Sequence, residues 1–61
     1  MEEKIKEILE IVRDGEIFSV QELENIGYDI EDIFKDHIQE RRKLNIYIRD
    51  NVRNNKDYEK N

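Results

Sequence analysis

The sequence contains no cysteine and no proline, and only two of its 61 residues are glycine. Without cysteine there is no disulfide to staple a small core, and a structural zinc site built on thiolates is not expected. At this length the chain forms one domain at most and buries little apolar surface. Stability must then come from well-capped helices or from association.

Long apolar runs are missing as well. No run approaches the ~20 residues that a membrane-spanning helix needs. The first four residues, Met1-Glu2-Glu3-Lys4, lack the basic start and apolar stretch of a signal peptide. We therefore expect a cytoplasmic protein without membrane attachment.

Charge is unevenly distributed along the chain. Residues 1–40 carry 13 acidic and 4 basic side chains, a net charge of −9, whereas residues 41–61 carry 3 acidic and 7 basic, a net charge of +4. Such asymmetry indicates two faces with different partners, or head-to-tail association of copies. The alternative is that these charges serve only solubility.

Aliphatic residues at helical spacing predict a first helix over residues 2–14. They recur at i, i+3, i+4 and i+7 and share one stripe. Its four members are Ile5, Ile8, Leu9 and Val12. Gly15 follows, where a left-handed residue commonly closes a helix.

Two capping signals follow, ten residues apart. Ser19 with Glu22 forms a capping box and predicts a short helix over residues 19–26, which Gly27 stops. Asp29 takes the next cap position and starts a third helix. No glycine or proline interrupts residues 28–61, so this helix is expected to run over residues 29–53, and residues 54–61 to form a frayed tail.

The fold class is therefore all-α, a small three-helix domain over residues 1–53. An alternative remains, because Leu44, Ile46 and Ile48 alternate as in a strand. In that case residues 44–53 would form a short C-terminal hairpin.

The order of helices and turns resembles the core of helix-turn-helix and winged-helix regulators over residues 5–40. Gly15, Ser19, Leu23 and Gly27 fall where such domains place turn, cap, core and turn. This resemblance implies a helix-turn-helix-like core with a long third helix, and under the hairpin alternative a wing.

The third helix has the wrong charge for reading DNA. A recognition helix directs its N-terminal residues at base edges within the negative field of the phosphates. Here that end offers four acids and only Lys35 in opposition: Asp29, Glu31, Asp32 and Asp36. The same acids also suit a helix N-terminus, where the dipole favours negative charge.

We therefore expect a regulatory or inhibitory module that binds another protein through an acidic surface. Small inhibitors from mobile elements, phages among them, use carboxylates in place of phosphates to occupy a basic nucleic-acid-binding protein. The expected partner-binding residues are Glu22, Glu24, Asp29, Glu31, Asp32 and Asp36.

The alternative function is a dimeric DNA-binding regulator that uses the basic segment 41–53. Its candidate nucleic-acid-binding residues are Arg41, Arg42, Lys43, Arg49 and Arg53. Cations near a helix C-terminus also have a purely structural explanation, because the dipole favours them there.

No residue pattern points to catalysis, a metal or a cofactor. His37 is the only histidine, and the chain has no phosphate-cradling glycine loop and no Ser/His/Asp or Cys/His arrangement. We expect a homo-oligomer, because several large apolar side chains exceed what so small a core can cover. These are Tyr28, Phe34, Tyr47, Ile48 and Val52.

Overall fold

The first helix forms where the aliphatic stripe predicts it. The computed structural model describes residues 2–60, with the side chains of residues 2–55, and its α1 covers Glu3–Arg13. All four stripe residues are buried, three of them completely. The helix ends at Gly15, which has φ +91° and donates its amide to the Val12 carbonyl at 3.0 Å. A glycine is favoured there because other side chains rarely adopt positive φ.

The capping box shapes the start of α2, which spans Val20–Ile26. The Ser19 Oγ accepts the Glu22 amide at 3.4 Å. In a usual capping box the Glu22 carboxylate would accept the amide of the cap residue, Ser19. Here it accepts the amide of the preceding residue, Phe18, at 2.6 Å. Gly27, at φ +125°, closes the helix, and its amide donates to the Glu24 carbonyl at 3.0 Å.

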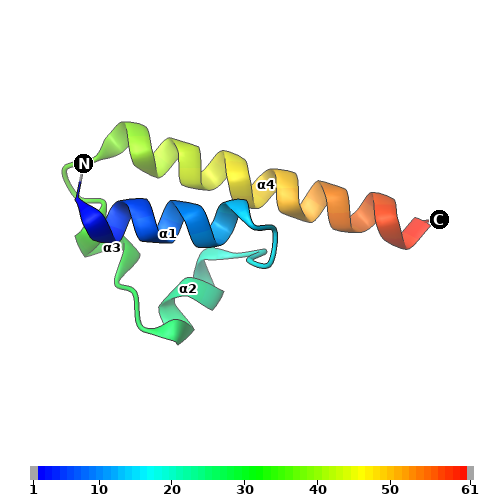
Figure 1. The fold of residues 1–61 in the computed structure, drawn as a ribbon, viewed down its shortest axis with the longest axis horizontal. Helices are drawn as coiled ribbons and strands as arrows, with labels where there is room; N and C mark the ends of the chain where they lie inside the picture. The colour runs from blue at the N-terminus through cyan, green and yellow to red at the C-terminus, as the bar shows by residue number, and fades with distance from the viewer. Residues whose placement is uncertain (1, 61) are drawn as a thin grey trace.

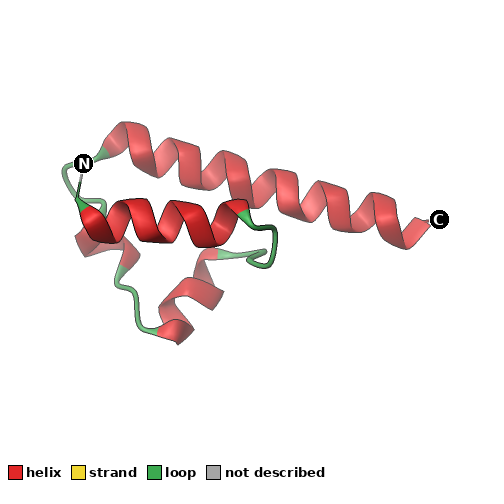
Figure 2. Cartoon of the chain, in the orientation of Figure 1, coloured by secondary structure: helices red, strands yellow, loops and turns green. Residues whose placement is uncertain are grey.

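The prediction of one long third helix over residues 29–53 is wrong, because this part of the chain forms two helices. Asp29 caps α3, which covers only Ile30–Ile33, and α4 covers Ile38–Lys60. The chain turns between them, and the His37 carbonyl then accepts the Arg41 amide at 2.9 Å as α4 begins. The count is therefore four helices, and within residues 2–60 no strand is present (Figure 2). The all-α class is confirmed, and the hairpin alternative over residues 44–53 is wrong.

Packing against a short α1 explains the turn. In one straight helix, Ile30 and Leu44 would lie about 21 Å apart, whereas the stripe of α1 is about 10 Å long. Ile30, Phe34 and Leu44 are nevertheless all buried in one apolar cluster with that stripe. The turn between α3 and α4 brings them together, and no glycine or proline marks it in the sequence.

The C-terminal helix also continues past residue 53, the expected end of the domain. α4 reaches Lys60 over 23 residues, so residues 54–60 are helical. Leu44 is its only completely buried residue with a described side chain, and Tyr47 and Ile48 pack against the cluster as partly buried neighbours. The alternating Leu44, Ile46 and Ile48 therefore do not form a strand, because all three lie in α4. Ile46 is 46% exposed, on a different side of the helix from the buried Leu44.

The helices α1 and α4 lie side by side and run in the same direction (Figure 1). The short helices connect the end of α1 back to the start of α4, and α2 lies on the side of α1 away from α4 in this view (Figure 1). Because α4 is about 34 Å long and α1 about 16 Å, α4 extends beyond α1 at its C-terminal end. None of the four helices, as far as residue 60, has the length and apolar character to cross a membrane.

Asn51 ties the parallel pair together at its far end. Its Nδ2 donates to the Val12 carbonyl and to the Ile17 carbonyl, each at 2.8 Å. Val12 lies in the last turn of α1, where carbonyls lack partners within the helix. One amide from α4 therefore satisfies the end of α1 and fixes the loop that follows it.

Most of the apolar side chains that suggested self-association are covered within the monomer. Phe34 is 4% exposed, and Tyr28, Tyr47 and Ile48 pack against the core. That reason for expecting an oligomer does not hold. The large apolar residues that remain exposed are Phe18, Ile26, Ile38 and Ile46.

Replacing Asn51 with alanine is expected to destabilise the fold by about 1–3 kcal/mol, because the Ile17 carbonyl loses the Asn51 donor and the Val12 carbonyl keeps only the Gly15 amide. In a domain of this size that lowers the melting temperature by roughly 4–8 °C per kcal/mol. Asn54→Ala is the matched control, one turn further along α4 at an exposed position. Thermal unfolding followed by circular dichroism compares them, and equal melting temperatures would contradict the role given to Asn51.

Candidate functional site

The six expected acidic residues lie on neighbouring elements, in α2, in α3 and in the turn before α4. Two of them cap helices. Glu22 accepts the Phe18 amide, and Asp29 accepts the Asp32 amide at 3.3 Å. The other four are exposed, and their carboxylates make no hydrogen bond or ion pair with any residue whose side chain is described. These four, Glu24, Glu31, Asp32 and Asp36, are called the acidic surface below.

A hollow lies at one end of the acidic surface. Glu24 and Asp29 line it together with Gly27 and Tyr28, and its volume is about 290 Å³. Ile26, the neighbour of Gly27 in sequence, is 59% exposed. Ile26 itself does not line the hollow, whose charged residues are both acidic.

Tyr28 joins the acidic surface to α1. Its hydroxyl donates a hydrogen bond of 2.6 Å to the Glu7 carboxylate. That bond raises the pKa of Tyr28 above its usual value, and loss of hydration and the Glu7 negative charge act in the same direction. No sequence rule links residues 7 and 28, because the contact depends on how the loop after Gly27 passes α1.

The five expected basic residues do not form one cluster. Arg41 turns toward its own helix and donates to the Asn45 side chain. Lys43 lines a groove between α1 and α4. Only Arg42, Arg49 and Arg53 share a side of α4, where all three are exposed and none is hydrogen-bonded or ion-paired to a described residue. The helical period therefore places the five basic side chains of residues 41–53 on three different sides of α4.

The three arginines share their side of α4 with two exposed isoleucines. At 100° per residue, the five side chains fall within an arc of about 80°, centred opposite Leu44. Ile38 is 67% exposed and Ile46 is 46% exposed. Ile38 is the first residue of α4 and lies away from the core. This α4 outer face consists of Ile38, Arg42, Ile46, Arg49 and Arg53.

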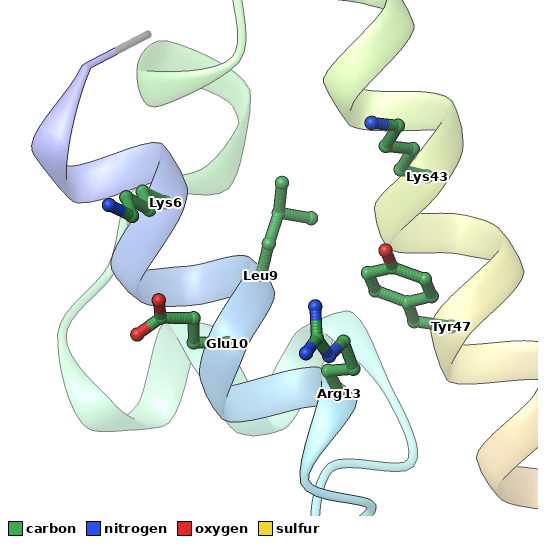
Figure 3. Close-up of a pocket in the computed structure, with 6 residues that line it drawn as sticks. All are labelled: Lys6, Leu9, Glu10, Arg13, Lys43 and Tyr47. Atoms are coloured by element: carbon green, nitrogen blue, oxygen red, sulfur yellow. The ribbon is translucent and has the colours of Figure 1, made fainter.

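The groove between α1 and α4 carries further cations, which the sequence analysis did not single out. Its volume is about 200 Å³, and Lys6, Glu10 and Arg13 line it from α1. Figure 3 shows Leu9, Arg13, Lys43 and Tyr47 reaching into the space between the helices. Lys6 and Arg13 are seven residues apart, so helical spacing places them on one side of α1, but Lys43 joins them only through the fold.

His37 lies between two carboxylates where α1 begins near α4. Its Nε2 is 3.4 Å from Glu2 and its Nδ1 is 3.6 Å from Glu40. Both pairs are partly exposed and weak, and only the one with Glu2 links the ends of the two helices. Across the described part of the chain, no group of three or more histidine, cysteine, aspartate or glutamate side chains is placed to hold a metal ion.

No protein-family model, curated protein or solved structure matches the chain. Charge, exposure and geometry therefore carry the functional argument.

Replacing Tyr28 with phenylalanine is expected to reduce stability at neutral pH but less so in alkali. A tyrosine whose folded pKa is raised contributes stability that is complete below the unfolded pKa of about 10 and is lost as the pH rises through the folded pKa. The difference in unfolding free energy between the wild type and Tyr28→Phe should therefore shrink above about pH 10. Urea denaturation at neutral and alkaline pH measures it, and a constant difference would show that the Glu7 bond does not hold the phenol proton.

Proposed function

We propose that the protein is a small regulatory or inhibitory module that binds a basic protein through its acidic surface. The observation that carries this proposal is the set of four exposed carboxylates on α2, α3 and the turn before α4, none of which is paired with a cation. Unpaired carboxylates are available to lysine and arginine side chains of a partner, and arginine can hold a carboxylate with two parallel hydrogen bonds. A negative field around such a surface also speeds the approach of a basic partner.

A nucleic-acid-binding protein is the basic partner that this surface suits best. Such proteins present rows of lysine and arginine to phosphates, and carboxylates on α2 and α3 would occupy those same cations. The protein would then act by competing with nucleic acid. This competition requires no catalytic group.

The alternative of a helix-turn-helix DNA reader has less support. Its recognition helix would be α3, which has only four residues and carries Glu31 and Asp32. A duplex would then face acids where base contacts are needed, so repulsion is expected. Three unpaired arginines on α4 favour nucleic-acid contact in a looser sense, without sequence reading.

Charge reversal at the acidic surface tests where a basic ligand binds. Binding of a fluorescent ten-residue oligolysine, followed by anisotropy at low salt, is expected to weaken by about tenfold or more in a Glu24→Lys, Glu31→Lys, Asp36→Lys variant. Asp32 is left unchanged because its amide donates the hydrogen bond to the Asp29 cap. The capping residues Glu22 and Asp29 are also retained, so the fold should survive, as circular dichroism will check.

A matched control separates a local surface from net charge. Changing Glu3, Glu10 and Glu16 to lysine alters the net charge equally, and these three side chains are exposed outside the acidic surface. The control variant should retain most of the oligolysine binding. Equal weakening in both variants would contradict the proposal, because only overall charge would then matter.

A further inference from the structure

The α4 outer face is an unusual surface for a monomer. Ile38 and Ile46 are among the most exposed large apolar residues of the described chain, and three arginines surround them within one arc. No acidic residue lies inside that arc, and none of the arginines has a described partner. Arginine and exposed aliphatic side chains together are characteristic of protein interfaces.

The acidic surface has the opposite charge. Its four carboxylates are exposed and also lack partners, and the exposed Ile26 follows Glu24 by two residues on α2. A contact between the two surfaces would pair arginines with carboxylates. Both halves of such an interface are present in this one chain.

Glu24, on α2, cannot reach the α4 outer face within one molecule, whereas Asp36 lies only two residues before Ile38. The α4 outer face is directed away from α1, since Leu44, on the opposite side of α4, is buried in the core. The helix α2, with Glu24 and Ile26, lies on the other side of α1 (Figure 1). Only another copy can bring Glu24 and the α4 outer face together.

We propose that the α4 outer face binds the acidic surface of a second copy of this chain. The inference rests on the acidic surface of the proposed function and adds that a second copy is one of its ligands. Nucleic acid is the weaker occupant of α4, because the net charge of −5 repels a polyanion and phosphates leave the isoleucines uncovered.

The contact joins two different surfaces, which determines how association grows. Such a heterologous contact leaves one free surface at each end, so further copies add until a ring closes. Association through α4 also occupies the acidic surface. Self-association and capture of a basic partner therefore compete for the acidic surface, which stays free only on monomers and on the end copy of an open oligomer.

Sedimentation velocity measures the association directly. From about 10 µM to about 1 mM protein, the average mass should rise above the 7.5 kDa monomer and pass that of a dimer. The rise should largely disappear between about 20 mM and about 500 mM salt, where exposed charges are screened. A mass that stays at the monomer value at low salt throughout this range overturns the proposal without requiring any variant.

Complementary charge reversal tests the two surfaces. Arg42→Glu with Arg49→Glu makes both surfaces acidic, and Glu24→Arg with Glu31→Arg makes both basic, so each variant alone should remain monomeric. An equal mixture should associate again, because each surface then meets its opposite. Arg13→Glu with Lys43→Glu is the control, since it removes two cations outside the α4 outer face and should associate like the wild type.

Failure to recover association in the mixture of folded variants overturns the proposal. Labelled duplex DNA provides a further decisive outcome. If the wild type stays monomeric and binds DNA in a salt-sensitive way that Arg42→Glu with Arg49→Glu removes, α4 is assigned to nucleic acid instead. The oligolysine experiment remains separate, because localised binding there supports the acidic surface even when copies do not associate.

Discussion

The arrangement of this protein depends on one contact, the burial of Leu44 in the apolar cluster built on α1. Burying a leucine fully contributes about 1.5–3 kcal/mol, a large share for a domain with nine buried core residues. Once Leu44 is inside, the helical period determines the rest of α4. It places Asn51 two turns later at the end of α1, and it directs Ile38, Arg42 and Arg49 outward.

The same contact also determines where the acidic and the basic residues lie in space, whereas the sequence shows only that most acids precede most of the basic residues. The acids of residues 22–36 lie on α2, α3 and the following turn, and the unpaired arginines lie on the far side of α4. Both the acids and the arginines remain exposed to solvent, because the core is too small to bury charged side chains. The proposed partners use these two sets of charges: a basic protein would bind the acids, and a second copy would join the acids of one chain to the arginines of another.

Local signals in the sequence predicted α1, α2 and the caps at Ser19 and Asp29 well, because each depends on residues within one or two turns. The break after Phe34 was missed, since it comes from packing Ile30 and Leu44 on one short helix and no glycine marks it. Three further features could not be predicted from the sequence, because each joins residues that are distant along the chain. They are the hydrogen bonds of Asn51, the bond between Tyr28 and Glu7, and the groove lined by Arg13 and Lys43. Of the candidate acids, composition did not separate those that cap helices from those that remain free.

The orientation of α4 about its own axis is the central claim, and NMR of methyl groups tests it most directly. In dilute protein, the Leu44 methyls should show nuclear Overhauser effects to Ile5, Ile8 or Val12, because all four are buried in one cluster. The Ile46 methyls should show none to α1. Effects from Ile46 to α1, with Leu44 lacking them, would mean that α4 is rotated and that its arginines do not form the outer face.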